Sequence, residues 1–143
     1  METVMIVVGN RIPAELLDRP VAESLRDVID RKGGKEHPFR RAIVLTDSAW
    51  RAEAQDVARN AVIAIGSHGA NELSKKLQEE PTPEATKFPV AGRAGCYGLF
   101  QKNAAGLPQV ALWGVDAKTT RRAVELYVED ETGLNEFINL VWK

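Results

Sequence analysis

Cysteine is almost absent from this sequence, because Cys96 is the only one among its 143 residues. A single cysteine excludes an internal disulfide, and such sparse usage is typical of a reducing compartment. We therefore expect a cytoplasmic protein held together by an apolar core. A chain of this length buries roughly 70% of its unfolded surface, which is enough for one domain over residues 1–143.

Long apolar runs and an excess of one charge are missing too. The 19 basic residues nearly balance the 20 acidic ones, so no strong field attracts nucleic acid or anionic lipid. No run approaches the roughly 18 to 20 apolar residues that cross a bilayer. The first apolar run follows an acid, Glu2, where a signal peptide carries a base, and it ends at Gly9. The sequence therefore predicts neither a nucleic-acid partner nor a membrane partner.

What the sequence does contain is three short apolar runs rich in β-branched residues, at residues 4–8, 42–45 and 61–65. Continuous runs of this length are typical of parallel strands buried on both faces. After the first run, Val21 and Leu25 recur at helical spacing behind Asp18 and Pro20, which predicts a helix capped by Asp18. A strand, a helix and a strand in this order predict a right-handed parallel crossover.

The second half of the chain adds one strand that runs against the others. Residues 96–102 and 109–115 are expected to be strands, joined by a hairpin loop containing Asn, Gly and Pro. We therefore predict an α/β fold with a three-layer Rossmann-like sheet, mostly parallel with one antiparallel strand. Residues 81–95 hold three prolines and two glycines without a clear period, so we expect a long loop there, either a lid or a plain connection.

A ligand site in such a fold is expected beyond the carboxyl ends of the parallel strands. The turn at residues 66–71 is predicted to offer free backbone N–H groups beside a helix dipole, which favours an anion, unless it is an ordinary strand-to-helix turn. Arginine side chains nearby suit phosphate or carboxylate. The candidate ligand-binding residues are Gly9, Asn10, Arg11, Asp47, Ser48, Gly66, Ser67, His68, Gly69, Asn71 and Arg93.

Catalytic residues are not assigned by these patterns. His68 suits a general base or a metal ligand, but no partner is fixed, and His37 is expected at the opposite end of the sheet. Cys96 is either a nucleophile near His68 or a small buried residue. Asp47 either orients a hydroxyl group or a metal ion, or caps the next helix, which contains Trp50, Ala54 and Val57. We expect no bound metal and no cofactor.

Three segments together resemble a recurrent module, with the sequences IGSHGAN at residues 65–71, CYGLFQKN at 96–103 and ALWG at 111–114. They are similar to the small α/β module of some archaeal surface-layer proteins and of uncharacterised bacterial proteins. That module has Gly-Gly where this chain has Gly66-Ser67, and Asn-Pro where it has Asn103-Ala104. The resemblance implies the fold and a Gly/Asn turn, and it carries no reaction.

Three functions follow from these patterns. The first is a domain that binds or senses a small anionic ligand, such as a phosphate or a nucleotide, with Arg11 or Arg93. The second is a homo-oligomeric module without catalysis, because the C-terminal helix has two apolar faces that suit a homodimer, formed by Phe137, Ile138, Leu140, Val141 and Trp142. Burial of that helix on several sides within one chain is the alternative. The third is a small hydrolase or transferase that uses His68.

Overall fold

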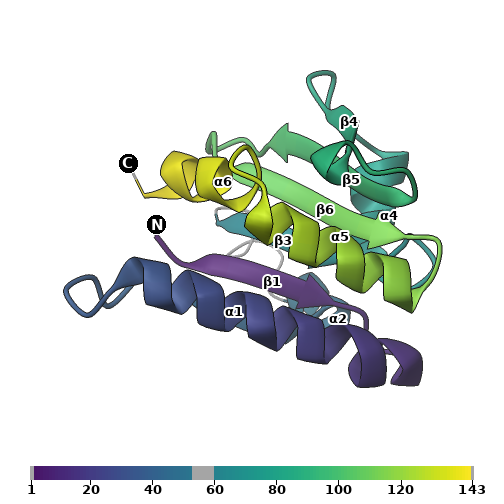
Figure 1. Cartoon of the computed structure of the whole chain (residues 1–143), viewed down its shortest axis with the longest axis horizontal. Helices are drawn as coiled ribbons and strands as arrows, with labels where there is room; N and C mark the ends of the chain where they lie inside the picture. The colour runs from purple at the N-terminus through teal and green to yellow at the C-terminus, as the bar shows by residue number, and fades with distance from the viewer. Residues whose placement is uncertain (1, 53–59, 143) are drawn as a thin grey trace.

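The computed structural model describes residues 2–52 and 60–142 (Figure 1). Its described strands form one sheet in the order β2-β1-β3-β6-β5-β4, which confirms the expected α/β class. β1, β2, β3 and β6 pair in parallel, and β5 is antiparallel to both of its neighbours. The strands are β1 (Val4–Val8), β2 (Ala42–Thr46), β3 (Ala61–Ile65), β4 (Thr86–Pro89), β5 (Cys96–Lys102) and β6 (Pro108–Gly114).

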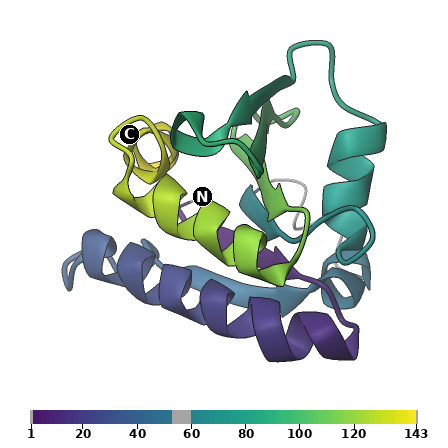
Figure 2. The ribbon, with the colours of Figure 1, turned by 45° about the vertical axis from the view of Figure 1, so that its right-hand side comes forward.

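Helices cover both faces of the sheet and produce three layers, which Figure 2 shows from the side. α1 (Arg19–Gly33), α5 (Ala117–Glu129) and α6 (Leu134–Val141) share one face, where the larger apolar cluster includes Leu25 and Phe137. α2 (Asp47–Ala52) and α4 (Glu72–Glu79) lie on the other face, where the smaller cluster includes Leu73. None of the helices in the described residues is long and apolar enough to cross a membrane.

The centre of the sheet explains the continuous apolar runs. All five residues of β3 are buried, because this strand lies between β1 and β6 and carries a helical layer on each face. No position on it faces water, so no alternation of polar and apolar residues arises.

The helical segment after β1 begins earlier than expected, so the prediction that Asp18 caps it was wrong. A π-helical turn, η1 (Ala14–Asp18), leads directly into α1. Asp18 has helical backbone angles, and its side chain makes no capping hydrogen bond. Pro13 stands at the start of η1 with helical angles, and a proline in the first turn of a helix is the signal that the prediction missed.

Residues 81–95 are more ordered than the long loop that the sequence predicted. They contain the edge strand β4, which pairs with β5 along its whole length, and the 3₁₀ turn η2 (Val90–Gly92). A four-residue strand is too short to show a period, and its Pro89 is tolerated because it lies at the edge of the sheet. The Phe88 ring packs against Gly98, where a Cβ atom would lie 2.3 Å from the ring.

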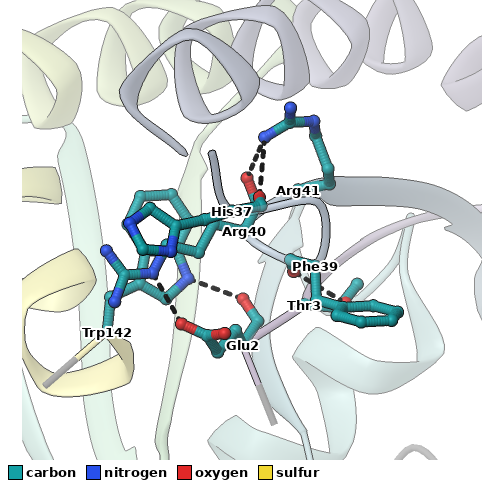
Figure 3. Close-up of polar contacts among 7 residues, drawn as sticks. All are labelled: Glu2, Thr3, His37, Phe39, Arg40, Arg41 and Trp142. Atoms are coloured by element: carbon teal, nitrogen blue, oxygen red, sulfur yellow. Dashed lines mark hydrogen bonds and ion pairs between the residues drawn. The ribbon is translucent and has the colours of Figure 1, made fainter. Parts of the chain in front are cut away.

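The two ends of the described chain meet beside the amino edge of the sheet (Figure 3). The indole N–H of Trp142 donates to the carbonyl oxygen of Glu2 at 2.6 Å, and the Arg40 guanidinium lies over the Trp142 ring. Arg40 also donates to the Glu2 carboxylate at 2.6 Å, and this bond lowers the pKa of Glu2. His37 lies at this end of the sheet, as expected, and its carbonyl oxygen accepts from Arg41.

The apolar faces of α6 are largely used within one chain. Leu134, Phe137, Ile138 and Val141 are buried among the residues of the larger cluster, and Trp142 is half-buried against it. A homodimer through this helix stays a prediction, but the apolar residues that suggested it, apart from Leu140, already pack against the larger cluster of the same chain.

Candidate functional site

The carboxyl edge of the sheet brings together most of the residues that the sequence singled out. The chain leaves β1 toward β2, whereas β3 pairs with the opposite side of β1, so the strand order reverses between β1 and β3. A reversal of this kind is where open α/β sheets place their ligand crevice. Residues 9–11 lie on one side of this crevice, and the turn at residues 66–71 lies on the other.

Asn71 ties the two sides of the crevice together. Its Nδ2 donates to the carbonyl oxygens of Val7, at 2.9 Å, and Ile65, at 2.8 Å. Its Oδ1 accepts from the backbone N–H groups of Leu73 and Ser74. An asparagine amide makes about four hydrogen bonds at most. Asn71, which is 1% exposed, therefore has no capacity left for a ligand.

The loops on either side also contact each other directly. A Cβ atom on Gly9 would lie 1.8 Å from the carbonyl oxygen of Ala70, so only glycine fits there. The guanidinium of Arg11 donates to the carbonyl oxygen of Gly69 at 3.3 Å. The chain's own groups therefore occupy much of the space that the strand order opens.

Asp47 follows β2, and its carboxylate binds the start of α4. Its Oδ2 accepts from the backbone N–H of Glu72 at 2.9 Å, and the side chain is buried. The first three N–H groups of α4 are thus bound by Asp47 and Asn71. Beside them, the Asn10 amide donates to the hydroxyl of Ser48. An anion at this helix terminus would find the helix donors already in use.

The helix expected after Asp47 is described only in part. Trp50 lies in α2 and packs against the smaller apolar cluster. Ala54 and Val57 lie outside the described residues.

The turn at residues 66–71 keeps some of the donors that the sequence predicted for an anion. The turn closes through the N–H groups of Ala70 and Asn71, which both donate to the carbonyl oxygen of Ser67. Arg11 lies beside it, whereas Arg93 is exposed just before β5, on the far side of β6 from β3. Within the described residues, the backbone N–H groups that keep no partner in this turn are those of Ser67, His68 and Gly69.

The residues considered for catalysis do not form a hydrogen-bonded set. His68 is exposed and makes no hydrogen bond within the described part of the chain. Cys96 is buried on β5, where its Sγ lies 3.8 Å from the carbonyl oxygen of Thr119. Among residues 2–52 and 60–142, no group of three or more His, Cys, Asp or Glu side chains is placed to hold a metal ion. A hydrolase or transferase centred on His68 gains no support from this geometry.

A buried carboxyl group that the site prediction missed lies at the same edge. Asp18 is 6% exposed, and its Oδ2 lies 3.2 Å from where a Cβ atom on Gly66 would be. It makes no hydrogen bond or ion pair with the described residues, and burial raises its pKa to about 6. The signal was its spacing: Asp18 stands four residues from Ala14 and from Ala22, which are both buried.

Two hollows open on the helical face that carries α1, α5 and α6. The first, the α1–α5 groove, has a volume of about 800 Å³ and runs between these two helices. The second, the aromatic pocket, has a volume of about 670 Å³. The residues that line the aromatic pocket are Thr86, Phe88, Pro89, Val90, Ala91, Gly92, Phe100, Tyr127, Asp130, Thr132, Gly133, Glu136, Phe137 and Leu140.

The role of Asn71 is testable by truncation. We expect Asn71→Ala to lower the free energy of unfolding by about 3 kcal/mol or more, because it removes a helix cap and leaves two buried carbonyl groups unpaired. Ser67→Ala is the matched control in the same turn and should change it by less than about 0.5 kcal/mol. Urea denaturation measures both. A cost below about 1 kcal/mol for Asn71→Ala would show that Asn71 does not hold the crevice closed.

The buried carboxyl group predicts a pH dependence of stability. Between the unfolded pKa of about 4 and the folded pKa of about 6, the unfolded chain ionises Asp18 while the folded chain keeps it protonated, so stability falls as the pH rises. Asp18→Asn removes this loss. Its stability relative to wild type should increase by about 2 kcal/mol from pH 4 to pH 7 in urea denaturation. If the stability difference between Asp18→Asn and wild type stays the same from pH 4 to pH 7, the assignment is wrong.

No protein-family model matches this chain, and no curated protein sequence matches it either. The resemblance to a surface-layer module therefore stays a prediction, and the proposals below rest on the geometry of the chain.

Proposed function

We propose that this domain binds a small organic cation with an apolar body, an amine or a quaternary ammonium compound, in the aromatic pocket. The observation that carries the proposal is the chemistry of the lining. Four aromatic rings and two carboxylates line the pocket, and no lining residue is basic. The rings of Phe88 and Phe100 are half-buried, and those of Tyr127 and Phe137 are buried. Aromatic faces and carboxylates both attract cations, and a concave apolar site with a few polar groups is the usual form of a small-molecule site.

The walls of the pocket come from two sides. Phe88 and Phe100 belong to the paired edge strands β4 and β5, and Tyr127 and Phe137 belong to α5 and α6. The Phe88 ring is held by its close packing on Gly98. Because all four rings belong to strands or helices, they are largely fixed before a ligand enters, which reduces the entropy that binding would cost.

Two acidic residues, Asp130 and Glu136, line the aromatic pocket together with these rings. Asp130 lies in the turn between α5 and α6, where Oδ1 accepts from the backbone and the hydroxyl of Thr132. Glu136 is exposed on α6 and has no partner among the described residues. Burial, together with the charges of Glu136 and Asp130, raises the pKa of the Tyr127 hydroxyl. A tyrosine hydroxyl is neutral at physiological pH with or without this shift, so the shift bears on the field around the ring. Part of that field comes from the two carboxylates, and a ligand ammonium group would offset it.

One wall of the pocket has unusual backbone geometry. Ala91 has a φ angle of 51°, and Gly92 follows it with a φ angle of 72°. Left-handed backbone at a residue other than glycine costs on the order of 1 kcal/mol and gathers at ligand-binding segments. This strain supports the proposal that η2 is shaped for a ligand.

The anion site predicted from the sequence is the second candidate. It is supported by the unpartnered N–H groups of the turn at residues 66–71 and by Arg11 beside them. It is the weaker one because the carboxyl groups of Asp18 and Asp47 lie at the same edge and the first N–H groups of α4 are in use.

A thermal-shift panel separates the two candidates. The panel contains phenethylamine and choline, the uncharged analogue phenethyl alcohol, and inorganic phosphate. A bound ligand at about 100 times its dissociation constant stabilises the fold by about 2.7 kcal/mol, or roughly 5–10 °C for a chain of this size. We expect an amine to produce such a shift, Glu136→Gln to remove most of it, and Glu131→Gln to retain it, since Glu131 is exposed outside the lining.

The other results are equally informative. Amines that leave the midpoint unchanged in the wild-type protein would overturn the proposal. A shift with phosphate that is lost in Arg11→Gln would assign the function to the turn at residues 66–71 instead.

A further inference from the structure

A face of the molecule that the proposed function does not use carries exposed apolar side chains. Leu16 is 69% exposed and Leu17 is 53% exposed, and both line the α1–α5 groove at the end where η1 enters α1. Ile12, 75% exposed, precedes them on the same segment. Val21 and Val28 continue the apolar lining along α1. A single exposed apolar side chain is common on protein surfaces. Several of them along one groove are typical of a surface that another molecule covers.

The groove is lined by residues of η1, α1 and α5. α1 and α5 lie side by side in Figures 1 and 2 and point the same way along the sheet, because each follows a parallel strand and returns across the same face. The apolar floor includes Leu25 and Val124. The rim on the α5 side is charged, and its residues are Lys118, Arg121, Glu125 and Glu129.

The order of charges on this rim opposes the dipole of α5. Lys118 and Arg121 lie in the first half of the helix, and Glu125 and Glu129 lie in the second half, all on one face at spacings of three and four residues. A helix is stabilised by acids near its N-terminus and by bases near its C-terminus. Along this rim the observed order is the reverse, and the acid at the start of α5 is its N-cap Asp116, which does not belong to the rim.

We propose that a second copy of this chain covers the α1–α5 groove, with the two α5 helices antiparallel across a two-fold axis. In this arrangement Lys118 of each copy faces Glu129 of the other, and Arg121 faces Glu125. A two-fold interface must be complementary to itself, and a row of two bases followed by two acids meets that condition only when the helices are antiparallel. The reversed order of charges on α5 then has a reason.

The charged residues of the rim have few partners within a single chain, which agrees with this arrangement. Within one copy the rim makes the exposed pair Arg121–Glu125 at 3.4 Å, and neither Lys118 nor Glu129 makes an ion pair with the described residues. Association would bury Leu16 and Leu17 and add contacts for all four charges. The apolar area would supply the affinity, and the charges would set the orientation.

A charge-swap experiment tests the arrangement. Lys118→Glu/Arg121→Glu makes the rim wholly acidic, and Glu125→Lys/Glu129→Lys makes it wholly basic. Each change agrees with the helix dipole but also replaces the exposed Arg121–Glu125 pair by two like charges. These effects are opposite in sign and similar in size, so each variant should fold about as well as wild type, which circular dichroism and thermal unfolding check. Sedimentation equilibrium should show wild type at about twice the 15.7 kDa of one chain, with association weakened at least tenfold in each variant.

Mixing the two variants gives the decisive comparison. An equimolar mixture should regain the dimer mass, because every acidic rim then faces a basic one. A wild-type chain that stays monomeric at about 200 µM would overturn the proposal. A dimer that both variants retain, or one that the mixture fails to restore, would overturn it too, because the interface would then lie elsewhere.

Discussion

The four hydrogen bonds of Asn71 are the constraint on which the carboxyl edge of this protein depends. They join β1, β3 and α4 at the point where the strand order reverses, and every polar atom of the side chain is used. Gly9 packs against Ala70 because the two strands are held this close. Asp47 completes the start of α4. The chain itself therefore uses much of the hydrogen-bonding capacity at the edge where this fold usually offers a crevice to a ligand.

The α1–α5 groove and the aromatic pocket, on which our two proposals rest, both depend on the position of α5. A capping box between Asp116 and Thr119 fixes where the helix begins, and the Thr120 hydroxyl accepts from the N–H of Gly114 at the end of β6. One flank of α5 meets α1 and makes the groove, and its C-terminal part meets α6 and η2 and makes the aromatic pocket. The two surfaces share no lining residue, so ligand binding and self-association are compatible.

The sequence predicted the elements that are determined by short stretches of neighbouring residues. Apolar runs of about five residues located the central strands, and a segment with Asn, Gly and Pro located the hairpin loop between β5 and β6. It missed β4 because four edge residues carry no period, and it misassigned Asp18 because the helix already starts near Pro13. Asn71 was a candidate for a ligand, but its partner Val7 lies 64 residues away, and only the pairing of β1 with β3 brings them together. The aromatic pocket combines four separate segments, so no single pattern indicates it.

The central claim of our proposal is that a small ligand binds in the aromatic pocket and not at the turn of residues 66–71, where the Asn71 side chain is fully used. Backbone amide shifts in nuclear magnetic resonance spectra test this directly when phenethylamine and, separately, inorganic phosphate are titrated into the labelled protein. The account predicts that phenethylamine moves the signals of residues 90–92 and 130–137 and leaves those of residues 66–71 in place. Signals that move chiefly at residues 66–71, with either compound, would contradict it.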